Sequence, residues 1–249
     1  MAGHSAWKNI KHKKAKSDAR KGKVWSKCAR AIIVAAKNGG GDPDTNVTLR
    51  YAVDDAKAAN MPKATIENAI KKGTGELTGE NYESLMYEGY GPGGVAMLIE
   101  VLTNNRNRTA GDVRLIFDKY GGNLGAAGSV SYLFSSKGVI TVARDAVTEE
   151  RLVELALDAG AEDVTDEGEV WQVTSEPAAF RAVRDAIAAA GIEPVGAELT
   201  MVPANTVQVS GETARKVLAL IEALEENDDV QKVHANYDVP QSQLAEIQG

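Results

Sequence analysis

Cysteine is nearly absent from this sequence, since Cys28 is the single one among 249 residues. One cysteine cannot form a disulfide within the chain, and such cysteine usage is typical of a reducing compartment. The sequence also lacks a long apolar run, and no apolar stretch follows its basic start. We therefore expect a cytoplasmic protein with neither a signal peptide nor a membrane span.

Motifs for catalysis or metal binding are also missing. His4 and His12, even together with Cys28, do not have the spacing of a known metal site. The glycine-rich residues 87–94 lack the Gly-Lys-Ser/Thr ending of a phosphate loop, and no serine sits in a nucleophile elbow. We therefore expect no enzyme activity, no metal, no cofactor and no small-molecule substrate. Cys28 lies among cations, but it falls on the apolar side of its predicted helix, which favours a small buried side chain.

Positive charge is scarce outside the first third of the chain. The net charge is −7, yet residues 1–75 contain 16 basic and 6 acidic residues, while the remainder contains 12 basic and 29 acidic residues. This asymmetry indicates a region that binds a polyanion, attached to an acidic body that repels the same ligand.

The basic charge is densest in residues 3–30, which contain ten Lys or Arg residues and one acid, Asp18. Residues 1–16 show no apolar period and are interpreted as an arm, whereas Ser17 can cap a helix that ends at Asn38 and Gly39. Cations of this density are attracted to phosphates because their binding releases counterions. The alternative to phosphate binding is that the basic residues form a solubilising tail and a solvated helix face. The face of the helix that we expect to be exposed carries Arg20, Lys23, Lys27 and Arg30.

Two further helices are predicted before the first linker. One runs from about residue 45 to residue 60, with Asp44 or Thr45 as its cap. Pro62 opens the next helix and Gly73 closes it. Together with the basic arm they predict a three-helix domain over residues 1–76.

Beyond the linker, residues 73–80, the apolar period changes mostly to two, which predicts strands. We expect strands over residues 82–90, 95–102 and 129–134, with a turn at residues 91–94 and a helix over residues 109–119. Residues 135–203 follow the order β-α-β-β-α-β of a ferredoxin-like unit. Residues 204–238 then offer one helix and one strand, which cannot bury an apolar face alone.

The predicted fold class is therefore α+β, with the N-terminal helical domain and its basic arm followed by two ferredoxin-like-type α/β domains, one inserted in the other. The middle domain combines residues 80–134 with residues 204–238, and residues 135–203 are the inserted domain.

A second candidate site lies at residues 104–109 (NNRNRT), where a strand gives way to a helix. Arg106 and Arg108 would lie near free backbone N–H groups at the positive end of the helix, which is a natural anion site. The alternative is that Asn107 or Thr109 caps the helix and the arginines are solvated. Arg114 could share their surface.

Several of these segments together resemble the YebC family, a bacterial family labelled as probable transcriptional regulators that is related to the mitochondrial translational activator of cytochrome c oxidase subunit I. The resemblance implies a helical domain with two α/β domains and nucleic-acid binding without catalysis. It is carried by residues 3–5 (GHS), 9–14 (NIKHKK), 57–62 (KAANMP), 69–73 (AIKKG), 87–95 (YEGYGPGGV), 104–109 (NNRNRT) and 121–125 (GGNLG).

The sequence thus predicts a non-enzymatic regulator of gene expression that binds nucleic acid. Promoter DNA follows the family label, whereas ribosomal RNA suits a lysine-rich arm that offers little base-edge recognition. No heptad or dimer seam occurs, so we expect a monomer. The predicted nucleic-acid-binding residues are Lys8, Lys11, His12, Lys13, Lys14, Lys16, Arg20, Lys21, Lys23, Lys27, Arg30, Arg106 and Arg108.

Overall fold

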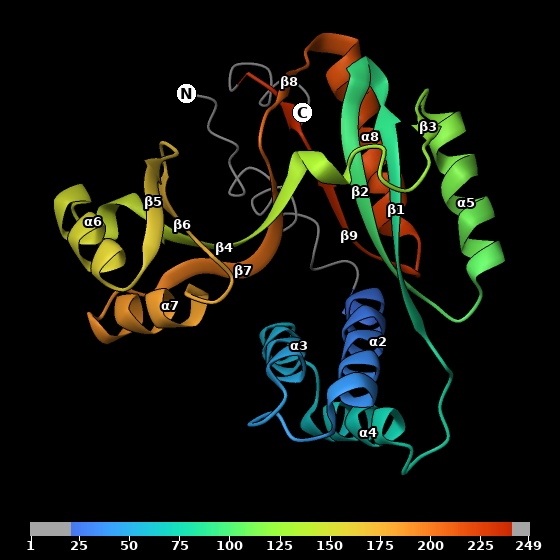
Figure 1. Ribbon diagram of the computed structural model, residues 1–249, viewed down its shortest axis with the longest axis horizontal. Helices are drawn as coiled ribbons and strands as arrows, with labels where there is room; N and C mark the ends of the chain where they lie inside the picture. The colour runs from blue at the N-terminus through green and yellow to red at the C-terminus, as the bar shows by residue number, and fades with distance from the viewer. Residues whose placement is uncertain (1–20, 241–249) are drawn as a thin grey trace.

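The computed structural model describes residues 21–240, which form a mixed α+β fold (Figure 1). Three helices come first, and two antiparallel four-stranded sheets with their own helices follow. In Figure 1 the three helices, blue to teal, lie below the middle sheet, and the second sheet lies to the left with its two helices. No helix within residues 21–240 is long and apolar enough to cross a membrane.

The first three helices pack around small and medium side chains, as their alanine-rich pattern predicts. Ile32, Leu49 and Ala56 are completely buried in their shared core. Cys28 packs at the margin of this core, and burial and the nearby Asp55 raise the pKa of its thiol to about 11. The helices are α2 (Lys21–Gly39), α3 (Val47–Ala58) and α4 (Lys63–Thr74).

The cap of α3 differs from the prediction. It is Asn46, not Asp44 or Thr45: the Asn46 Oδ1 accepts a hydrogen bond from the backbone N–H of Leu49 at 3.0 Å. The Asn46 amide also donates to the backbone oxygen of Ala35 at 2.8 Å, so the same side chain ties α3 to α2. The same amide donates to the backbone oxygen of Gly40 at 2.8 Å, and neither Asp nor Thr has two side-chain donors beside an acceptor.

The end of α4 also differs from the prediction, because Gly73 lies inside the helix. A Cβ atom at Gly73 would lie 2.5 Å from the backbone oxygen of Ile33, so this glycine permits close approach of α4 to α2. The helix instead ends at Gly75, whose φ of 84° is the left-handed conformation that glycine adopts at low cost.

The middle sheet has the strand order β3-β1-β2-β9, and every neighbouring pair is antiparallel. Its central strand β2 is almost entirely buried, and one sheet face packs on two helices through Met97, Ile99, Phe117 and Leu220. Its strands, helices and the short 3₁₀ turn between β1 and β2 are β1 (Glu83–Gly91), η2 (Pro92–Gly94), β2 (Val95–Thr103), α5 (Arg106–Lys119), β3 (Asn123–Leu124), α8 (Gly211–Glu226) and β9 (Val230–Ala235).

This sheet corrects two predictions. Its chain order is β-β-α-β-α-β, the order of the elements predicted for residues 80–134 and 204–238, so the ferredoxin-like type predicted for both α/β domains does not apply to it. The strand predicted over residues 129–134 is also wrong: this segment holds the 3₁₀ turn η3 (Ser131–Leu133), and β3 takes the edge of the sheet. The buried carboxylate of Glu88 causes the difference, since it accepts backbone N–H groups of Gly128, Val130 and Ser131 that a strand would need for its own pairing.

The second sheet follows the β-α-β-β-α-β order, with the strand order β5-β6-β4-β7. Its core contains Ile140, Trp171, Phe180 and Ile187, and Thr148 caps its first helix. Its elements are β4 (Phe134–Ala143), η4 (Arg144–Ala146), α6 (Glu149–Asp158), β5 (Ala161–Asp166), β6 (Val170–Ser175), α7 (Phe180–Ala189) and β7 (Pro194–Pro203). After β7, the short strand β8 (Val207–Gln208) pairs in parallel with β10 (Tyr237–Asp238).

Candidate nucleic-acid interface

The predicted arm lies outside the described residues, as do the seven predicted site residues within it and in the start of its helix. The described side chains are those of Lys23, Lys27 and Arg30 on α2, and of Arg106 and Arg108 on α5. Lys21 is the first residue of α2. The residues outside the described range are Lys8, Lys11, His12, Lys13, Lys14, Lys16 and Arg20.

Lys23, Lys27 and Arg30 of α2 bind the end of another helix, α8. The Nζ of Lys23 donates to the backbone oxygen of Glu226 at 3.0 Å, and the Nζ of Lys27 donates to that of Glu225 at 2.7 Å. Arg30 donates to the backbone oxygen of Asp228. The last carbonyl groups of a helix have no partner within it and lie at the negative end of its dipole, so cations stabilise this end.

Asp229, which follows α8, extends this contact to α5. Its Oδ1 lies 3.0 Å from Nη1 of Arg30, and its Oδ2 lies 2.7 Å from Nη2 of Arg108. The hydroxyl groups of Thr109 and Thr103 donate to the same Oδ2, at 2.6 and 3.2 Å. One buried carboxylate therefore joins α2, β2 and α5.

The environment of Asp229 keeps its carboxylate ionised. Burial alone would raise the pKa of this group, but hydrogen bonds from Thr109 and Arg108 and the charges of Arg108 and Arg30 outweigh burial. The pKa of Asp229 consequently lies below its ordinary value. Arg30 of α2 and Arg108 of α5 therefore meet a stable negative charge supplied by the chain itself.

The exposed cationic face predicted for α2 is corrected in part. Lys23 is exposed, but Lys27 is half-buried, and the Arg30 side chain retains 18% exposure beneath its protein partners. The guanidinium of Arg30 also lies 5.4 Å from the centre of the Tyr82 ring. Charge patterning on one helix cannot show that a distant acidic segment covers it. A usable signal was the acid-rich segment EENDD at residues 225–229.

At the N-terminus of α5, the side chains of Arg108 and Thr109 bind the carboxylate of Asp229. The helix begins at Arg106, and its cap is Asn105, not Asn107 or Thr109. The Asn105 Oδ1 accepts from the backbone N–H of Arg108 at 3.1 Å. Arg106 is exposed at this end of the helix.

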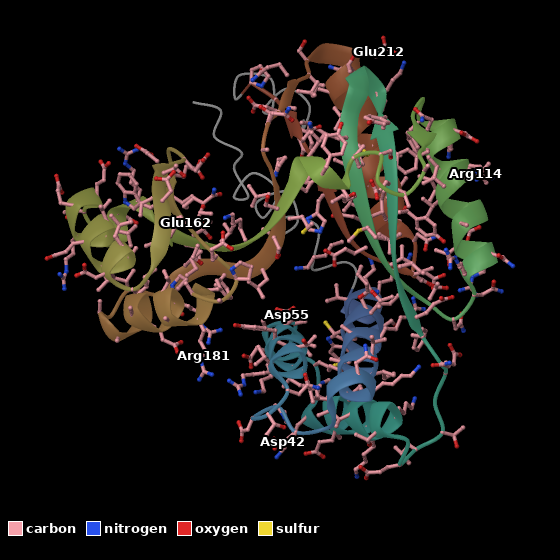
Figure 2. All side chains as sticks on the ribbon, in the orientation of Figure 1. Asp42, Asp55, Arg114, Glu162, Arg181 and Glu212 are labelled. Carbon is pink, nitrogen blue, oxygen red and sulfur yellow. The ribbon has the colours of Figure 1, made fainter. Side chains whose placement is uncertain are left out.

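Further along α5, Arg114 also projects from the exposed side of the helix (Figure 2). Arg106 and Arg114 thus lie on the exposed surface of this helix, and Arg108, which is also partly exposed, binds the Asp229 carboxylate.

A second polar contact, missed by sequence reasoning, lies between β9 and the inserted sheet. The Nζ of Lys232 lies 3.1 Å from Oε2 of Glu198 on β7. His234 bonds to Glu100 through Nε2 at 2.7 Å and contacts the hydroxyl of Thr200 through Nδ1 at 3.3 Å. The contacts with Glu198 and Thr200 hold the edge strands β9 and β7 together, whereas the pair of His234 and Glu100 lies within the middle sheet. Within residues 21–240, no three His, Cys, Asp or Glu side chains are grouped to hold a metal ion.

Comparison with known proteins places these features in a family context. A family model described as "TACO1/YebC protein N-terminal domain" matches residues 5–76, and one described as "TACO1/YebC second and third domain" matches residues 82–237. A relative from Rubrobacter xylanophilus, named "Probable transcriptional regulatory protein", is 54% identical over 250 residues, covering 100% of both chains. One of the same name from Persephonella marina is 53% identical and covers 99% of this chain and 100% of its own.

A solved structure supports the fold. The crystal structure of a conserved hypothetical protein from Aquifex aeolicus has a TM-score of 0.81 at 50% sequence identity. The match covers 91% of this chain and 94% of that chain.

Proposed function

Because this chain belongs to the TACO1/YebC family, we propose that it is a non-enzymatic regulator of gene expression that acts by binding nucleic acid. The name "Probable transcriptional regulatory protein", carried by relatives that match along their whole length, supports a regulatory role. Promoter DNA is the target that this name favours.

The observation that carries the proposal is the concentration of positive charge at the N-terminus. Residues 1–75 hold 16 of the 28 basic residues of a chain whose net charge is −7. A ligand that is attracted to this region and repelled by the rest must be a polyanion. The proposed contacts are Lys8, Lys11, His12, Lys13, Lys14, Lys16, Arg20, Lys21, Lys23, Lys27, Arg30, Arg106 and Arg108.

We also propose a division into three domains. The helical domain is residues 1–76, the middle domain joins residues 80–134 to residues 204–238, and residues 135–203 form a ferredoxin-like domain inserted in it. Separate apolar clusters in the three parts support this division. The basic region would then be carried by one domain, and the acidic charge by the other two.

A second candidate function is that of a translation factor on ribosomal RNA. Of the three described site cations of α2 (Lys23, Lys27 and Arg30), Arg30 is largely covered by protein and the other two are lysines. Lysine suits phosphate contacts better than base edges, which a DNA recognition helix must read. This observation favours recognition of a charged backbone or a folded RNA shape over reading of a DNA sequence.

Two measurements on the full-length protein distinguish these targets. Sedimentation with ribosomes at physiological salt tests the RNA, and a footprint on promoter-length DNA with unrelated competitor tests the DNA. A discrete footprint that survives competitor, with ribosomes unbound, supports transcriptional regulation. Ribosome co-sedimentation without a footprint supports the translation factor. Binding to neither would refute the proposed function.

A further inference from the structure

We infer that the cationic face of α2 has two alternative occupants: the end of α8, as in this structure, and the phosphates of the bound nucleic acid. We call the contacts of Lys23, Lys27 and Arg30 with residues 225–229 the α2–α8 latch. The inference rests on the proposed function and adds a regulatory contact to it. A latched protein would present its N-terminal arm alone, and an open protein would add the face of α2.

The two occupants offer α2 the same chemistry. In the latch, each cation meets carbonyl oxygens at the end of α8, and Arg30 also meets the Asp229 carboxylate at 3.0 Å. A phosphate group likewise presents oxygen acceptors and negative charge, and arginine binds it in a bidentate manner. One cation cannot bind a phosphate and the end of α8 fully at the same time, so phosphate binding and closure of the latch compete.

The strength of the latch is graded along α2. The pair of Lys23 and Asp228 is 3.7 Å long, with side chains that are 53% and 64% exposed, so salt and a dense polyanion weaken it readily. The Arg30 pair is much less exposed, because the carboxylate of Asp229 lies beneath it. The outer end of the latch would therefore open first, next to the predicted arm.

Helices α2, α3 and α4, which we call the helical unit, can move together because they share an apolar core separate from those of the sheets. Ile32, Leu49 and Ile66 pack within α2, α3 and α4, and residues 75–82 alone link α4 to β1 along the chain. Contacts of α3 with the sheets must also separate on opening. The rings of Tyr51 on α3 and Phe180 on α7 lie 5.9 Å apart, and Asp55 on α3 interacts with the charge of Lys232 on β9. Figure 1 shows the three helices as a group joined to the sheet by this linker.

The first test locks the latch by cross-linking. Lys23→Cys and Asp228→Cys are introduced together with Cys28→Ser, and a short flexible bis-maleimide joins the two new thiols. The matched control is the same protein with both thiols capped by N-ethylmaleimide. Binding of labelled random-sequence duplex DNA and of single-stranded RNA is then measured against salt concentration, since both probes supply phosphates but differ in shape.

We expect the linked protein to bind more weakly than the capped protein, since Lys27 and Arg30 stay on α8. Loss of two phosphate contacts should reduce the log–log salt slope by about 1.5, because each contact contributes roughly 0.7 to 0.9. Equal affinity and equal slope in the two preparations would overturn the inference and leave the proposed function standing. Failure of the wild-type protein to bind either probe would overturn the proposed function itself.

The second test observes opening directly. A donor and an acceptor dye are attached at Val47→Cys on α3 and Leu115→Cys on α5, in a Cys28→Ser background; both native side chains are well exposed. Saturating nucleic acid should reduce energy transfer, and unchanged transfer at saturation would overturn the inference.

Weakening the latch should have the opposite effect to locking it. Asp229→Asn should reduce energy transfer before any ligand is added and should tighten binding about 2- to 5-fold by raising the open population. The matched control is Asp158→Asn, which makes the same charge change on the exposed face of α6. If the two variants tighten binding equally, net charge explains the effect and the latch does not.

Discussion

Arg30 on α2 and Asp229 after α8 are joined by an ion pair of 3.0 Å across 199 sequence positions. The side chains are 18% and 6% exposed, so water screens the pair little. The same carboxylate binds Arg108 at 2.7 Å, and thereby links the helical unit to the N-terminus of α5. This pair is one of the contacts that join the basic region to the acidic body.

Replacement of Arg30 by Ala should lower the free energy of unfolding by about 1–3 kcal/mol, because it removes one partner of a largely buried charge. Chemical unfolding followed by circular dichroism measures the change. Arg181→Ala is the control, since Arg181 forms an exposed pair with Asp185 on α7 that should contribute only about 0.3–0.5 kcal/mol. Equal effects of the two changes would contradict the buried role of Arg30.

Asp229 should make stability depend on acid pH. Its pKa is lower in the folded chain than in the unfolded chain, so its contribution is fully present above the unfolded value of about 3.9 and is lost as pH falls through the folded pKa. We expect Asp229→Asn to lose stability at neutral pH and to show a flatter fall below pH ~4 than the wild-type protein. Thermal unfolding at a series of pH values measures both, and parallel curves would count against this assignment.

Replacement of the buried carboxylate of Glu88 should strongly lower the stability of the fold. This carboxylate accepts hydrogen bonds from the backbone N–H groups of Gly128, Val130 and Ser131. Glu88→Gln places an amide donor against one of these donors, which should cost roughly 2–4 kcal/mol. Hydrogen exchange of residues 125–131 should accelerate in this variant. Glu83→Gln, at an exposed position of the same strand, should leave that exchange unchanged.

The two arginines at the start of α5 should respond differently to replacement by lysine. Arg108 pairs with Asp229, so Arg108→Lys should reduce stability through loss of its fixed hydrogen-bond geometry. Arg106 is exposed, so Arg106→Lys should leave stability unchanged and weaken nucleic-acid binding modestly. Arg106→Lys with full binding and full function in cells would show that Arg106 is merely solvated.

Deletion of residues 1–16 should remove most nucleic-acid affinity but should leave thermal unfolding nearly unchanged, because this segment lacks apolar periodicity. If the arm meets about six phosphates, the log–log salt slope of the intact protein should be roughly −4 to −5. Replacement of Lys11, Lys13 and Lys14 by Glu should flatten this slope. An unchanged slope in that variant would exclude the arm as the main contact.

The sequence alone determined the type and approximate position of most elements, because these follow from local periodicity. The apolar spacing on α2, the apolar run of β2 and the β-α-β-β-α-β order after residue 135 all require only neighbouring residues. Family membership was predictable for the same reason, since motifs such as residues 104–109 are read along the chain. The sequence likewise determined the separation of a basic N-terminus from an acidic body.

Tertiary structure decided the helix ends and the partners of the cations. Asn46 replaces the predicted caps because its amide also reaches α2, and Gly73 stays helical because α4 approaches the backbone of Ile33. The predicted anion site of α5 is filled by Asp229 and the predicted face of α2 meets the end of α8. Both outcomes depend on residues more than 100 positions away, and an electrostatic partner at that distance leaves no periodic signal in the sequence.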